Sequence, residues 1–320
     1  MKSARKKHRG LLFLFFIILM PVLLLSTCAL GEIQNGGQRN GDGLRTIQIA
    51  ATGGFHNYFL PWDYLSDQFY GGGSLAQTAA AIRELRENNN IILIDCGDSI
   101  QGNAGDLFAR DPVEPMADGM NFLNYDACAA GISDLLAGSE RLRKIKQSLD
   151  APFIASNIDI KPSDSPLGDE CAVIETKNGG PRIGVLNFIA PGDDNLNNFN
   201  ILDPIESARR VIDAYQNQCD IFIAIAHANN NNNNLINDLA AACPEIAVIL
   251  SPESYNPENS AICDLSLITL TAEFSANRWN VLDIKREEIN PRDYNPDPDL
   301  SARLEPYDLW AKETVRAGIA

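Results

Sequence analysis

Histidine and basic residues are scarce in this chain. Its 320 residues include 3 histidines and 26 lysines and arginines, against 42 aspartates and glutamates. Five of the basic residues lie within the first ten positions, so the remainder has 21 basic and 42 acidic residues, a net charge near −21. Because a nucleic-acid backbone binds to a basic face, this balance excludes a nucleic-acid polymer as a partner. An anionic substrate would need local help, normally from a metal ion.

Paired cysteine motifs, long internal repeats and hinge-like linkers are also missing. Apart from Cys28 there are six cysteines and no CxxC pair, so disulfides are permitted but their pairing cannot be assigned. Several of the six lie in apolar runs, which fits buried free thiols equally well. Without an internal boundary, residues 45–287 are predicted to form one domain, followed by an acidic, proline-rich segment and a helix in residues 288–320.

One long apolar run is present, at residues 11–25, directly after the basic N-terminus. This order predicts a secretory signal peptide over residues 1–28. The run ends in Leu-Ser-Thr-Cys, which resembles a bacterial lipobox with Thr27 in place of the usual smaller residue, and predicts lipidation of Cys28. An uncleaved anchor and a plain secreted protein are the alternatives. Residues 29–44, rich in Gly, Asn and Gln, would then be a flexible tether.

Each of these three alternatives places the body of the protein outside the cytoplasm. The lipid or the uncleaved signal would attach the chain to a membrane, and the domain would lie in the cell envelope, on its periplasmic or its outer face. The sequence does not identify a protein partner.

Apolar runs and helical patterns alternate through the domain. Strands are predicted at residues 46–51, 91–95 and 221–226, and helices at 74–87 and 205–216. A strand, helix and strand in succession indicate parallel strands with right-handed crossovers, and hence an α/β fold. A hairpin is expected to join residues 171–176 to 182–189. Residues 265–272 and 281–285 alternate like antiparallel strands, and we expect them in a second sheet.

The stretch from Ile91 to Gly102 is the most informative. A wholly apolar run followed by an acidic, glycine-rich turn predicts a buried parallel strand whose loop exposes the carboxylate of Asp98. In open α/β sheets, ligands bind at this carboxyl edge. The alternative is that Asp98 only caps the following turn.

Four predicted strand-end loops carry side chains that can bind metal: His56, Asp98, His227 and Glu253. Carboxylates and imidazoles that converge from separate loops are a common design for a divalent metal site. For each residue alone, a hydrogen bond to the loop backbone is the competing interpretation.

Three motifs resemble one enzyme family. Residues 59–64 (FLPWDY), 97–102 (GDSIQG) and 120–127 (MNFLNYDA) are similar to the N-terminal domain of bacterial 5'-nucleotidases and 2',3'-cyclic-nucleotide phosphodiesterases, within the calcineurin-like metallophosphoesterases. The resemblance spans residues 47–315. It implies an α/β fold, a four-layer α-β-β-α sandwich of two mixed sheets flanked by helices. It also implies hydrolysis of phosphate esters by two metals bridged through Asp98.

Several family positions are altered. Gly54 stands where the family's Asp-x-His loop has its aspartate ligand. Ile132 and Tyr255 stand at ligand positions of two other loops, so three ligand positions are lost. Ser133 occupies the position of the histidine that the family uses as general acid. In the family that the chain resembles, a C-terminal domain usually follows and stacks the base of the nucleoside between aromatic side chains. Because the helix near residues 300–315 lies so close to the end of the sequence, we expect no such aromatic clamp.

These departures lead to three functional hypotheses. The leading one is an exported, degenerate metallophosphoesterase domain with lost or very weak activity and a binding or envelope role. The alternative is an active hydrolase of phosphate mono- or diesters, nucleotides included, with one Zn, Mn or similar ion on Asp98, His227 and Glu253. The third is a structural lipoprotein whose loops bind nothing.

Overall fold

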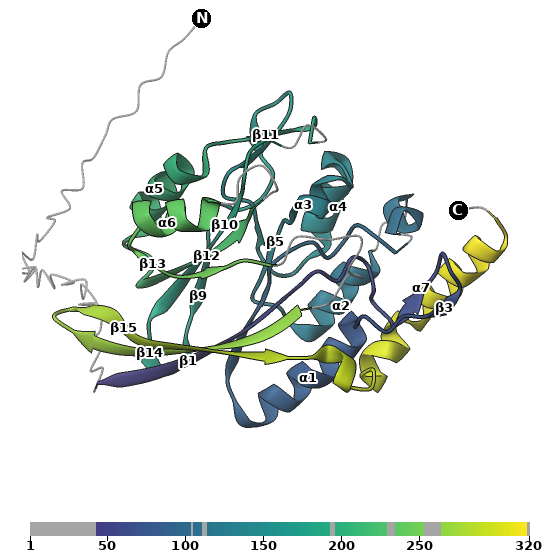
Figure 1. Cartoon of the computed structure of the whole chain (residues 1–320), viewed down its shortest axis with the longest axis horizontal. Coiled ribbons are helices and arrows are strands. Elements are labelled where there is room, and N and C mark those ends of the chain that lie inside the picture. The colour runs from purple at the N-terminus through teal and green to yellow at the C-terminus, as the bar shows by residue number, and fades with distance from the viewer. Residues whose placement is uncertain are drawn as a thin grey trace, which may run out of the picture. The chain divides into compact units, whose positions relative to one another are not determined.

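The computed structural model places most of the domain. It describes residues 43–103, 105–110, 114–192, 196–228, 234–252 and 264–318 (Figure 1). The predicted signal peptide, the predicted lipidation site and nearly all of the predicted tether lie outside these ranges, as do Glu253 and Tyr255. Among the described helices, none combines the length and apolarity that crossing a membrane requires.

The larger sheet has six strands in the order β15-β14-β1-β4-β5-β6. Its bounds are β1 Leu44–Gly53, β4 Ile91–Asp95, β5 Ala127–Ala129, β6 Phe153–Ile154, β14 Asp264–Ser275 and β15 Arg278–Ile289. The pairs from β1 to β6 are parallel, as predicted for the first two, whereas β14 is antiparallel to both β1 and β15. The expectation of a separate second sheet for the last two strands was therefore wrong. Alternation marks a strand with one buried face, but it does not identify the pairing partner.

A second mixed sheet has the order β13-β12-β10-β9. It contains β9 Ala172–Glu175, β10 Arg182–Ile189, β12 Ile221–His227 and β13 Ile246–Leu250. The predicted hairpin is confirmed, because β9 and β10 pair in antiparallel register around a short turn, η2 (Lys177–Gly179). Two minor sheets complete the strands: β11 Phe199–Ile201, β7 Ile158–Ile160 and β8 Ser165–Pro166 form one, and β2 Trp62–Asp63 and β3 Gln68–Phe69 the other.

Some of the described helices begin at side-chain caps. Ser74 accepts a hydrogen bond from the backbone of Gln77 at the start of α1, and Asp297 caps α7 in the same way. The described helices are α1 Leu75–Asn88, α2 Pro115–Leu123, α3 Ile132–Leu135, α4 Ser139–Ser148, α5 Pro204–Tyr215, α6 Leu235–Ala242 and α7 Pro298–Arg316. Two further turns are 3₁₀ helices: η1 Gly105–Arg110 and η3 Pro291–Asp293.

Three apolar cores alternate with the two sheets. The first includes Leu93 of β4 and Leu300 of α7, together with residues of α1 and α2. The second fills the space between the sheets, where Ile94 of β4 and Ile223 of β12 are both fully buried. The third packs α5 and α6 onto the smaller sheet, as Figure 1 also shows. The loops that follow β1, β4, β5 and β12 emerge at carboxyl strand ends, where the candidate residues lie.

Candidate functional site

Asp98 lies in the loop after β4, but its carboxylate is buried rather than exposed as predicted. The residue is 5% exposed and adopts a positive φ of 56°. Its Oδ1 accepts two hydrogen bonds from Ser133, one from the backbone N–H at 2.7 Å and one from the hydroxyl at 2.8 Å. Ser133 therefore holds this oxygen in an internal clamp.

The second carboxylate oxygen of Asp98 faces His227, at the end of β12. Its Oδ2 lies 3.5 Å from His227 Nδ1, and the imidazole is 3% exposed. The other ring nitrogen, Nε2, is buried without a hydrogen-bond partner among the described residues. Burial disfavours the charged carboxylate, but the hydrogen bond and charge of His227, with the two bonds from Ser133, outweigh it and lower the pKa of Asp98 to about 2.

Asp134 connects the loop after β5 to the loop that carries Asp98. Its carboxylate accepts the backbone N–H groups of Asp98 and Ile100, each at 2.8 Å, and that of Gly131 at 2.9 Å. Gly131 permits this contact, since a Cβ there would lie 2.2 Å from the Asp98 nitrogen. Burial and the charge of Asp98 raise the pKa of Asp134 to about 6, although the three backbone hydrogen bonds act to lower it.

A third buried carboxylate, Asp95, lies beneath these loops. It accepts hydrogen bonds from the hydroxyl of Ser99 at 2.9 Å and the hydroxyl of Thr52 at 3.2 Å, and Thr52 also contacts the hydroxyl of Tyr125 at 2.9 Å. Burial and the charge of Asp134 raise the pKa of Asp95 well above its ordinary value. Sequence reasoning assigned no role to either acid, although their place at strand ends was a usable signal.

His56 lies beside the same loop, on the turn after β1. Its backbone N–H donates to the carbonyl of Asp98 at 3.0 Å, and that of Gly54 to the carbonyl of Gly97 at 2.9 Å. The side chain of His56 is 7% exposed. Burial lowers its pKa, although the charge of Asp98 acts in the opposite direction. The structure thus brings together His56, Asp98, Ser133 and His227, whereas Glu253 lies outside the described residues.

A buried ion pair supports the loop that follows Asp98. Arg141 of α4 donates to both carboxylate oxygens of Glu114, at 2.8 and 2.9 Å, and the two side chains are about equally buried. The same guanidinium reaches Gln101 Oε1 at 3.1 Å and the carbonyl of Gly105 at 2.8 Å. The side chain therefore fixes both ends of the segment between Gln101 and η1.

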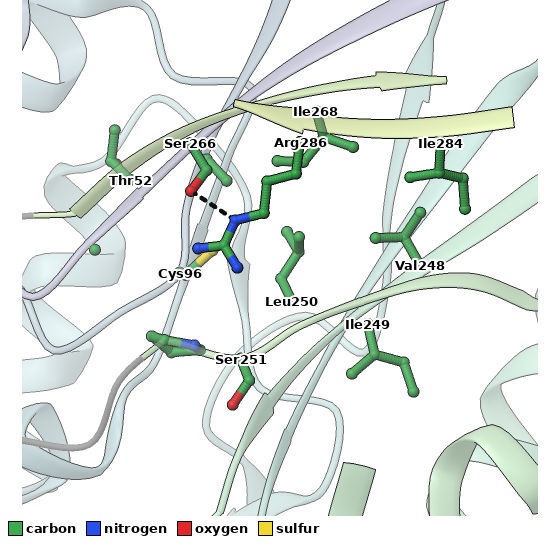
Figure 2. A pocket seen from close by; sticks show the side chains of 13 residues that line it. Thr52, Cys96, Val248, Ile249, Leu250, Ser251, Ser266, Ile268, Ile284 and Arg286 are labelled. Atoms are coloured by element: carbon green, nitrogen blue, oxygen red, sulfur yellow. Dashed lines mark hydrogen bonds between the residues drawn. The ribbon is translucent and has the colours of Figure 1, made fainter. Parts of the chain in front are cut away.

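A hollow of about 140 Å³ opens where β1 and β13 end (Figure 2). The walls contributed by β13 and by the last strands are largely apolar. Arg286 projects into this space, and its Nε donates to Ser266 at 3.2 Å. Gly53, the residue before Gly54, is one of those that line the hollow.

The described residues alone do not provide a zinc-type site. Within the described ranges, no group of three or more His, Cys, Asp or Glu side chains could hold an ion, whereas zinc sites use three or four protein ligands. At the position that the family fills with a ligand, Ile132 packs against the first core. Of the predicted mononuclear set, Asp98 and His227 lie together as a pair. The third member, Glu253, lies outside the described residues.

Comparison with known proteins adds relatives of this domain. No family model matches the chain. The trifunctional nucleotide phosphoesterase YfkN of Bacillus subtilis is 26% identical over 240 residues, which cover 65% of this chain and 16% of that protein. An apyrase of Tabanus yao is 25% identical over 198 residues, 58% of this chain and 35% of the relative. The chain thus matches only a minor part of each curated relative.

Solved structures share the fold. The calcineurin-like phosphoesterase YfkN aligns with a TM-score of 0.74 and 24% identity, over 85% of this chain and 99% of that one. A 5'-nucleotidase precursor from Thermus thermophilus aligns with a TM-score of 0.62 and 20% identity, over 85% of this chain and 59% of that one. These likenesses show that the domain has the fold of calcineurin-like phosphoesterases, as found in YfkN and in the N-terminal part of 5'-nucleotidases.

Proposed function

We propose that the protein is an exported, lipid-anchored, degenerate metallophosphoesterase domain with lost or very weak hydrolytic activity and a binding or envelope role. The observation that carries the proposal is the clamp of Ser133 on Asp98 Oδ1. The proposal takes the fold as the four-layer α-β-β-α sandwich of the family, which the alternation of cores and sheets supports.

The clamp opposes the chemistry of the family. A bridging carboxylate must direct its oxygens at two cations, but Asp98 directs one oxygen at two hydrogen-bond donors and the other at His227. A two-metal phosphoesterase needs both ions to stabilise the attacking and leaving oxygens. With Gly54 and Ile132 at ligand positions, the donor set for that pair is missing from the described residues.

Metal analysis and a phosphoesterase assay test the proposal together. The full chain, purified in detergent after growth with added zinc and manganese, should contain far less than one metal ion per molecule. Turnover of bis-p-nitrophenyl phosphate and of nucleotides should equal that of Asp98→Ala. The exposed Asp150→Ala serves as the matched control. Robust turnover that Asp98→Ala abolishes and Asp150→Ala retains would refute the proposal.

The second candidate is a mononuclear hydrolase with one ion on Asp98, His227 and Glu253. The specific observation in its favour is the buried Nε2 of His227, which has no hydrogen-bond partner among the described residues and which a metal ion would satisfy. This candidate requires about one ion per chain, lost in His227→Ala and kept in His56→Ala, with activity that follows the metal. A metal-free protein after growth with zinc and manganese would exclude it.

Membrane attachment and ligand binding need separate measurements. If Cys28 carries a lipid, Cys28→Ala should move the protein from the membrane fraction to the soluble extracytoplasmic fraction. A phosphate ester or nucleotide that binds the native state should raise the melting temperature. No shift with any metal, phosphate or nucleotide would favour the third hypothesis, a structural lipoprotein.

A further inference from the structure

The hollow between the two sheets exists because side chains become smaller toward the end of β1 (Figure 2). On the face of β1 that lines the second core, Ile49 is followed by Ala51 and then by Gly53. On the paired strand β14, the same face changes from Ile268 to Ser266. Ala51 and Ser266 are partners in the register of the two strands, as are Ile49 and Ile268. The small residues therefore lie side by side and leave this end of the core unfilled.

The wall on the side of the smaller sheet is apolar. It is contributed by β13, the edge strand of that sheet, through Val248 and Leu250, which also pack against the second core. The space measures about 140 Å³. A cavity of roughly 150 Å³ with aliphatic walls is large enough to bind benzene. One aromatic ring or a short alkyl chain would therefore fit.

A guanidinium group projects into this space from β15. Figure 2 shows the side chain of Arg286 in the hollow, where its Nε donates to the hydroxyl of Ser266 at 3.2 Å. Its Nη2 also lies 3.3 Å from Glu288 Oε1, but the two side chains are 62% and 79% exposed, so solvent weakens this ion pair. A guanidinium has five N–H donors. Donors of Arg286 thus remain for a ligand, as far as the described residues show.

These features together define a class of ligand. Arginine binds oxyanions through two parallel hydrogen bonds, and apolar walls favour hydrocarbon over water. An inorganic anion would leave the wall of β13 uncovered, whereas a neutral hydrocarbon would not use the guanidinium. The hollow is therefore suited to a small molecule that has an anionic head and a short apolar body.

We propose that the hollow is a binding site for a small organic anion, a phosphonate, phosphate monoester or carboxylate that carries a ring or a short alkyl chain. The oxyanion binds Arg286, and the apolar body lies against Val248 and Leu250. This inference rests on the binding role proposed above and names the class of ligand for it. It requires neither a metal ion nor hydrolysis.

Titration calorimetry of the full chain in detergent, with phenylphosphonate as the probe, tests the site. The phosphorus–carbon bond of this probe is not a phosphate ester, so binding is measured apart from phosphoesterase activity. The wild type should bind one molecule per chain. Arg286→Gln should weaken the affinity roughly ten- to hundredfold, because it removes hydrogen bonds between two charged groups. Arg278→Gln, which alters an exposed arginine of the same strand, is the matched control and should retain the wild-type affinity.

Three further probes separate the two halves of the ligand. Benzoate replaces the phosphonate by a carboxylate, and comparison of its affinity with that of phenylphosphonate identifies the preferred head group. Benzyl alcohol lacks the charge and inorganic phosphate lacks the ring, so each should bind at least about tenfold more weakly than phenylphosphonate. Inorganic phosphate that binds as tightly as phenylphosphonate would contradict the role of the apolar wall.

A second variant tests the place of the ligand. Ala51→Ile continues the isoleucine pattern of β1 into the hollow and should abolish binding of phenylphosphonate, with the fold checked by circular dichroism. Unchanged binding in the folded variant would overturn the proposal, as would equal affinity of the wild type and Arg286→Gln, or no binding of phenylphosphonate and benzoate. Turnover of bis-p-nitrophenyl phosphate would refute the loss of activity but not this site, so the two failures are distinguishable.

Discussion

Replacing Arg141 by methionine tests whether the loop that carries Asp98 depends on the buried ion pair. The side chain of Arg141 is 5% exposed and that of Glu114 is 4% exposed. Arg141→Met removes two hydrogen bonds to Glu114 and those to Gln101 and Gly105, all between 2.8 and 3.1 Å. It also leaves the Glu114 carboxylate buried without its counter-ion. Because breaking one side of a buried pair exposes the full desolvation penalty, the free energy of unfolding should fall by about 3–5 kcal/mol.

Urea unfolding followed by circular dichroism measures this loss. The double variant Arg141→Met/Glu114→Leu should recover about 2 kcal/mol relative to Arg141→Met, since no unpaired charge remains. Arg143→Met alters an exposed arginine of the same helix and should change the unfolding free energy by less than about 0.5 kcal/mol. If Arg141→Met costs no more than Arg143→Met, the ion pair does not support the loop.

Four further predictions concern the site itself. Gly131→Ala should cost about 3 kcal/mol in unfolding free energy, because its Cβ would lie 2.2 Å from the Asp98 nitrogen, whereas Gly71→Ala meets open space and should be neutral; equal losses would contradict the contact. Ser133→Ala should cost about 1–2 kcal/mol and raise the pKa of Asp98 in an NMR titration, since it removes one donor to the carboxylate; an unchanged pKa would argue against the clamp. The folded pKa of Asp98, about 2, is below its unfolded value, so its stabilisation is lost as the pH falls from 4 to 2. Asp134 has a raised folded pKa of about 6, so wild-type stability should decline as the pH rises from 4 to 6. Asp134→Asn should flatten that decline in melting temperature, and an identical slope in the two proteins would refute it.

Local patterns predicted the elements of the domain well. The apolar run at Ile91–Asp95 is a fully buried parallel strand, and the helix predicted at residues 74–87 spans Leu75–Asn88 after its cap, Ser74. The pairing of distant strands was less accessible, because β14 joins β1 at the edge of the first sheet through contacts between residues far apart in sequence. Periodicity carries no information about such partners.

One pair of the candidate site was predicted from the sequence, but its chemical environment was not. Loop positions at carboxyl strand ends did bring Asp98 and His227 together. The sequence did not reveal that Asp98 would be buried and bonded to Ser133, since a hydrogen bond between two loops depends on their backbone conformation. It also did not reveal the role of Asp134, whose three backbone partners lie in two separate loops.

The clamp on Asp98 limits what a single substitution at residue 133 could do. Only one of its two donors belongs to the side chain of residue 133, and the other is a main-chain N–H that every substitution except proline would retain. Placing a histidine at this position would thus add an imidazole without releasing the carboxylate oxygen. Metal binding through that oxygen would require the loop to change its path, which no single side-chain replacement supplies.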